Sequence, residues 1–105
     1  MYNKSMNKLV RDNIPDIIKK SGKTGIIHIA DSEEYLQKIY EKLQEETKEF
    51  LKERKIEELA DLLELIYTIA KIKNISKEKL EQIRLQKKEV KGGFDKKYIL
   101  NRMKN

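Results

Sequence analysis

Apolar residues recur along most of the chain at the three- and four-residue spacing of an amphipathic helix. The longest stretch of this pattern runs from 32 to 73 without a glycine or a proline. One helix of that length is unusual in a small domain. The phase of the apolar stripe changes on either side of four consecutive charges, Lys52-Glu53-Arg54-Lys55. We therefore predict a tight turn at 53–54 that joins two antiparallel helices in a hairpin.

Shorter elements are predicted before the hairpin. A helix is expected near 14–20, with Asn13 as its cap, a proline in its first turn and Ser21-Gly22 at its end. The β-branched segment 24–30 is typical of a short strand. Asp31 and Glu34 then have the spacing of a capping box at the start of the hairpin.

A further helix is predicted after the hairpin. It begins after Ser76, which is a good cap, and it stops at Gly92-Gly93, before an extended tail at 94–100. The fold class is therefore all-α: a single domain over 1–105, built as a helical bundle around the hairpin, with a short N-terminal helix and one short strand.

Composition narrows the range of partners. The chain has 105 residues and no cysteine, and 40% of its residues are charged while 38% are apolar. This balance is typical of a folded protein, and no apolar run approaches the ~20 residues of a membrane span. We expect a cytoplasmic protein without a membrane partner. The net charge of +6 favours anionic ligands, but nucleic acid is not expected, since there is no arginine cluster or reading motif.

Two pairs of acids in the hairpin have matching positions. Glu46 and Glu49 lie three residues apart, as do Glu58 and Asp61, so each pair shares one helix face. Glu49 and Glu58 are equally far from the centre of the predicted turn, and so are Glu46 and Asp61. An antiparallel hairpin therefore brings the two pairs to the same level.

The positions of these acids on their helices indicate a metal site. Glu46 and Glu58 fall inside the apolar stripes, while Glu49 and Asp61 lie at the stripe edges. Clustered buried carboxylates cost several kcal/mol unless they are compensated. A divalent cation compensates them, and an all-oxygen ligand set suits Mg²⁺ or Mn²⁺. The alternative is that such spacings arise by chance on the solvated surface of a lysine- and glutamate-rich helix.

These residues also carry a family resemblance. "EETKEF" (45–50) followed by "EELADLLELI" (57–66) resembles the EExxE…ExxD signature of the all-α, MazG-like nucleoside triphosphate pyrophosphohydrolases. That superfamily includes dimeric dUTPases and phosphoribosyl-ATP pyrophosphohydrolase. "KLVRDNIPDII" (8–18) and "KKEVKGGFDKKYIL" (87–100) resemble a small branch of predicted house-cleaning enzymes. The resemblance covers roughly residues 8 to 100.

The resemblance implies a set of site residues and a reaction. Glu46, Glu49, Glu58 and Asp61 match the family's metal-binding acids, and Glu45 matches the extra acid that begins the signature. The reaction implied is Mg²⁺-dependent hydrolysis between the α- and β-phosphates, which gives a nucleoside monophosphate and pyrophosphate. Glu46 or Glu49 is the candidate general base. The base, the sugar and phosphoribosyl-ATP as a substrate are left open.

Basic residues are needed because acids alone would repel a triphosphate. Arg11 is favoured, with Asp12 to orient it; the alternative is that Arg11 and Asp12 only tie the N-terminal segment down. The other candidates are Lys8, Arg84, Lys87, Lys88 and Lys91.

Self-association is expected for a separate reason. The apolar arc of the second hairpin helix spans about 200°, wider than a helix covered on one side requires. A partner copy would cover the remaining face, so a homodimer is the minimum and a tetramer is open. The function predicted is a nucleotide pyrophosphohydrolase; the alternative is a non-catalytic basic helical module that binds nucleic acid or a protein.

Overall fold

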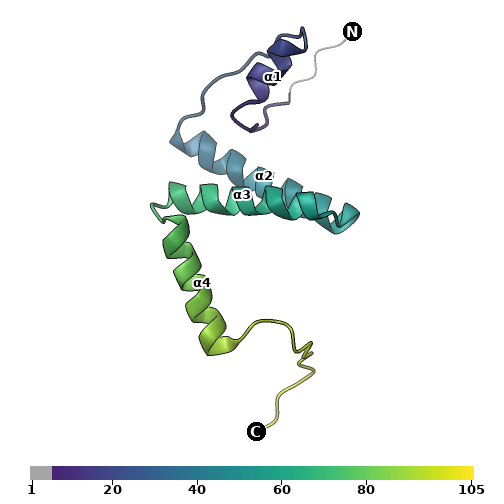
Figure 1. The fold of residues 1–105 in the computed structure, drawn as a ribbon, viewed down its shortest axis with the longest axis vertical. Coiled ribbons are helices and arrows are strands. Elements are labelled where there is room, and N and C mark those ends of the chain that lie inside the picture. Colours follow the sequence, from purple (N-terminus) through teal and green to yellow (C-terminus); the bar gives the residue numbers. More distant parts are fainter. Residues whose placement is uncertain (1–5) are drawn as a thin grey trace. The chain divides into compact units, whose positions relative to one another are not determined.

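The structure is a computed structural model that describes residues 6–105, and within them all regular structure is α-helical. The helices are α1 (Ile14–Lys20), α2 (Ser32–Glu53), α3 (Ile56–Ile72) and α4 (Lys77–Lys91) (Figure 1). The predicted all-α class is confirmed. None of the helices in this part of the chain combines the length and the apolarity that crossing a membrane requires.

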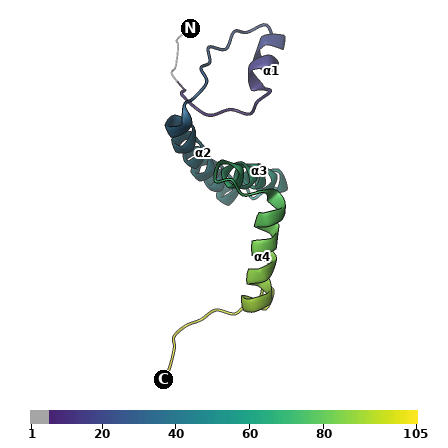
Figure 2. The same cartoon turned by 90° about the vertical axis from the view of Figure 1, so that its left-hand side faces the viewer.

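Helices α2 and α3 form the predicted hairpin, and they run side by side in both views (Figure 1, Figure 2). Arg54 ends α2 in the left-handed conformation, with φ 59°, and its N–H donates to the carbonyl of Phe50 at 2.7 Å. This residue reverses the chain, and α3 begins at Ile56. The break falls inside the run of charges because those side chains must stay in water when two helices meet.

The other helix boundaries also follow local signals. α1 covers the predicted residues and is followed by Gly22 at φ 86°. Ser76 caps α4, where its hydroxyl accepts from the N–H of Lys79 at 3.1 Å, and the helix ends before Gly92. One detail of the prediction is wrong: Asn13 stands at the N-cap of α1, but its side chain makes no capping hydrogen bond.

The strand predicted at 24–30 is absent. The segment carries no strand pairing, and the side chains of Ile26 and Ile29 are 98% and 95% exposed. A strand needs a partner to satisfy its backbone, and residues 6–105 contain none. The segment is held instead by His28, whose Nε2 lies 2.9 and 3.0 Å from the two carboxylate oxygens of Glu34.

The chain divides into two compact units, Met1–Ile69 and Ala70–Asn105. The first contains α1, α2 and most of α3; the second contains α4 and the C-terminal tail. Among the described residues, the buried apolar side chains are those of Ile39 and Ala70 alone. A core this small leaves much apolar surface of the hairpin in water.

Candidate functional site

Three glutamates converge where α2 turns into α3. One carboxylate oxygen from each of Glu49, Glu53 and Glu58 lies within 4.8 Å of the other two. Glu49 and Glu53 are four residues apart on α2 and so share a face, and the tight turn brings Glu58 from the first turn of α3 to the same place. The predicted approach of Glu49 and Glu58 is confirmed. This acidic cluster could hold a metal ion.

Glu53 was not among the predicted site residues, because it was assigned to the charged turn. In the structure it is the last residue of α2. Its Oε2 also lies 3.7 Å from Nζ of Lys55, an exposed ion pair that offsets part of its charge. Its four-residue spacing from Glu49 is the signal in the sequence that could have identified it. This spacing places both carboxylates on one side of the helix, provided that the helix extends to Glu53.

Glu58 is the buried member of the cluster, with 8% of its surface exposed. Burial raises the pKa of its carboxyl, and the nearby Glu53 and Glu49 raise it further, while a hydrogen bond from the backbone of Lys55 opposes the rise. That N–H donates to Oε1 of Glu58 at 3.3 Å. The contact is the one that the acid of a capping box makes, so Glu58 also helps to start α3.

The raised pKa of Glu58 predicts a pH-dependent stability. A carboxyl whose folded pKa lies above its ordinary value of 4.5 stabilises the fold most below that value. The contribution is lost as the pH rises through the folded pKa. Relative to Glu58→Gln, which keeps an acceptor and lacks the charge, wild type is expected to gain stability as the pH falls from neutral.

Urea unfolding of both proteins in metal-free buffer between about pH 4 and pH 8 checks this expectation. The readout is how the difference between the two free energies of unfolding changes with pH. A difference that is constant with pH reports only the weaker hydrogen bond of the amide. A difference that does not change over this range would contradict a raised pKa at Glu58.

The other two predicted ligands lie outside the acidic cluster and are paired with cations. Oε1 of Glu46 lies 3.6 Å from Nζ of Lys42 on the preceding turn. Oδ1 of Asp61 accepts a 2.7 Å hydrogen bond from Nη2 of Arg11. Each carboxylate therefore already has a positive partner in this structure, and both stay predicted metal ligands.

Two of the predicted phosphate-binding residues lie beside the hairpin acids. Arg11 contacts Asp61, rather than the neighbouring Asp12 as expected, and Nζ of Lys8 lies 3.4 Å from Oε2 of Glu45. These ion pairs attach the N-terminal segment to both helices of the hairpin. The paired residues lie far apart in the sequence, and no local sequence pattern connects them, so these ion pairs could not be predicted.

The remaining predicted cations lie on α4, in the second unit. Nε of Arg84 donates to Oε2 of Glu81 at 2.9 Å, one turn away on the same helix. Lys88 and Lys91 are exposed in the last turns of α4. Their role in phosphate binding stays a prediction, as does that of Arg84.

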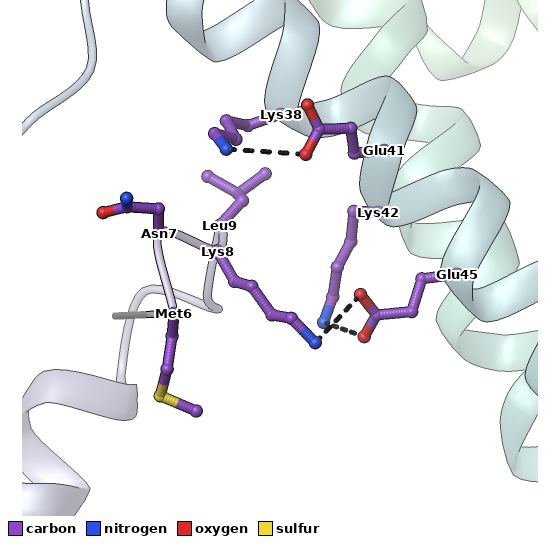
Figure 3. A pocket seen from close by; sticks show the side chains of 8 residues that line it. All are labelled: Met6, Asn7, Lys8, Leu9, Lys38, Glu41, Lys42 and Glu45. Atoms are coloured by element: carbon purple, nitrogen blue, oxygen red, sulfur yellow. Dashed lines mark hydrogen bonds and ion pairs between the residues drawn. The ribbon is translucent and has the colours of Figure 1, made fainter. Parts of the chain in front are cut away.

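A small pocket lies between the N-terminal segment and α2 (Figure 3). Its volume is about 120 Å³, enough for a phosphate-sized group and too small for a nucleotide. Three lysines and two glutamates supply its charged groups. The residues that line it are Met6, Asn7, Lys8, Leu9, Lys38, Glu41, Lys42 and Glu45.

Comparison with known proteins gave no match to a protein-family model, to a curated protein or to a solved structure.

Proposed function

We propose that the protein is a Mg²⁺-dependent nucleotide pyrophosphohydrolase that cleaves between the α- and β-phosphates, with non-standard nucleotides as its substrates. The observation that supports this best is the acidic cluster of Glu49, Glu53 and Glu58 at the hairpin turn. A buried carboxylate beside two others is costly without a counter-charge. The resemblance to MazG-like enzymes adds a reaction in which such acids hold the metal.

The cluster fits a small divalent cation. The three carboxylates form an all-oxygen donor set, which is the set that Mg²⁺ prefers. One carboxylate oxygen from each of the three lies within 4.8 Å of the other two, so the side chains would have to move closer together to share one ion. The ion would supply charge screening for the phosphates and a polarised water. Mn²⁺ would satisfy the same oxygens.

The chain's own groups would then bind the cation, accept a proton and bind the phosphates. Glu49, Glu53 and Glu58 would bind the cation, while Glu46 or Glu49 would accept a proton from the attacking water. The water oxygen would bond to the α-phosphorus, and the bond from that phosphorus to the bridging oxygen would break, which releases pyrophosphate. Arg11 would bind a phosphate oxygen once the substrate separates it from Asp61.

The working form is proposed to be a homodimer or a larger oligomer. Leu59, Leu63 and Ile66 form a line along α3, and their side chains are 43%, 46% and 42% exposed. Hydrophobic residues at this spacing are ordinarily covered by a neighbouring element. A second copy would cover them and enlarge a core that holds few buried side chains.

The proposed function is tested by measuring pyrophosphate release from a panel of standard and modified nucleoside triphosphates and phosphoribosyl-ATP, with Mg²⁺ or Mn²⁺. Release from at least one of them, abolished by a chelator and restored by the metal, is the expected result. A folded protein that hydrolyses none of the panel and binds neither metal would contradict the proposal. That outcome would favour the alternative of a non-catalytic interaction module.

A further inference from the structure

We propose that the pocket between the N-terminal segment and α2 is a binding site for a pyrophosphate group, and that Lys8, Lys38 and Lys42 hold it. Nothing in the metal chemistry above uses this pocket. The natural ligand is inferred to be the distal phosphates of a nucleotide, and this part of the inference rests on the proposed function. Binding of free pyrophosphate does not depend on it.

The carboxylate of Glu45 marks the anion position. Nζ of Lys8 lies 3.4 Å from its Oε2, and Nζ of Lys42 lies 3.6 Å from its Oε1. Figure 3 shows the two ammonium groups reaching this carboxylate from two different elements, the N-terminal segment and α2. An oxyanion held between two ammonium groups is the arrangement in which a phosphate would bind. Glu45 occupies that place and would compete with the ligand.

Each ammonium group around the pocket already contacts a carboxylate, which marks where an anion can bind. Lys38 adds a third ammonium group, and Nζ of Lys38 lies 3.5 Å from Oε1 of Glu41. Glu46 also lies 3.6 Å from Nζ of Lys42, so the three ammonium groups face three carboxylates, and a ligand anion would bind by displacing one of them. The side chains of Lys38 and Lys42 are 24% and 26% exposed, so their charges are screened less than those of free surface lysines.

The position of the pocket along α2 indicates what its ligand is attached to. Lys38, Lys42, Glu49 and Glu53 fall on one side of the helix at about 100° per residue. Lys42 and Glu49 are seven residues apart, or about 10 Å along the axis. A phosphate chain lying along this side would meet the lysines at one end and the acidic cluster at the other. A monophosphate would reach only one of the two.

Calorimetric titration of the metal-free protein with inorganic pyrophosphate tests the pocket directly. Lys42→Gln is expected to weaken binding by about tenfold, since it removes one charged contact. Glu45→Gln is expected to strengthen binding several-fold, because it removes the competing carboxylate. Lys48→Gln is the matched control: it removes one charge from an exposed residue of the same helix and should bind like wild type.

The opposite directions of the two pocket variants separate this proposal from loss of folding, and unchanged binding by Lys48→Gln separates it from a general charge effect. Equal binding by all four proteins, or weaker binding by Glu45→Gln, would overturn it, as would the absence of binding to wild type. The proposed function can fail separately: wild type that binds pyrophosphate in this pattern but hydrolyses no nucleotide would leave the pocket standing without the enzyme. Orthophosphate in the same titration shows whether one phosphate suffices.

Discussion

Glu49→Gln is expected to remove Mg²⁺ binding and to lower pyrophosphate release by at least about 100-fold. Mutation of a group that only supports a metal ligand typically lowers metal affinity or activity by 10- to 100-fold. Glu49 is proposed to bind the ion itself, so its loss should have at least this effect. It belongs to the acidic cluster in the structure and to the EExxE signature in the sequence. The amide keeps the size of the side chain and removes the charge that the cation needs. Calorimetry with Mg²⁺ and an assay of released pyrophosphate provide the two measurements.

The matched control is Glu57→Gln. Glu57 is an exposed acid in the first turn of α3, beside Glu58 in the sequence but outside the acidic cluster. The Glu57→Gln substitution removes the same charge from the same end of the hairpin as Glu49→Gln, so a general electrostatic effect would appear in both variants. Metal binding by Glu49→Gln equal to that of the control would show that the cluster is not the cation site.

Two further variants decide between alternative ligand sets. The cluster contains Glu53, whereas the sequence signature supplies Glu46 and Asp61 in its place. Glu53→Gln should weaken Mg²⁺ binding if the geometry of the hairpin turn defines the site. Glu46→Gln should do so if the cation lies one turn farther from the hairpin end. If Glu46 is only the general base, its variant keeps metal affinity and loses turnover.

The hairpin could be predicted because its signals are local. Four consecutive charges and a change in the phase of the apolar stripe both lie within a few residues of the turn, and Arg54 reverses the chain there. The approach of Glu49 to Glu58 followed from this turn alone. The prediction of a strand was wrong because strand propensity expresses how well a segment fits against a neighbouring strand. The local sequence around Ile26 does not tell whether such a neighbour is present.

The parts of the candidate site that were missed depend on longer-range contacts or on the last residue of a helix. The pair of Arg11 with Asp61 spans 50 residues, and no periodic pattern connects them. Glu53 joins the cluster only because α2 continues to it, and helix ends are the least regular part of a helix. The sequence therefore predicted the level of the acidic cluster along the hairpin better than the set of side chains that form it.

Leu63→Asp is expected to convert the proposed homo-oligomer to a monomer. Leu63 lies at the middle of the exposed apolar line of α3, four residues after Leu59 and three before Ile66. An aspartate there would have to be buried without a partner, which costs several kcal/mol. Because each 1.4 kcal/mol changes a dissociation constant tenfold, the constant should rise by at least about 100-fold. Size-exclusion chromatography with light scattering over a range of concentrations measures the change.

Thr68→Asp is the control, because it introduces the same charge on the polar side of α3, where Glu64 already lies one turn away. Wild type that is monomeric at every concentration, or equal dissociation of both variants, would refute the apolar line as an interface. The monomer also tests the site. Because Glu49, Glu53 and Glu58 all belong to one chain, Leu63→Asp should still bind Mg²⁺. Loss of metal binding together with the oligomer would mean that the second copy supports the hairpin turn.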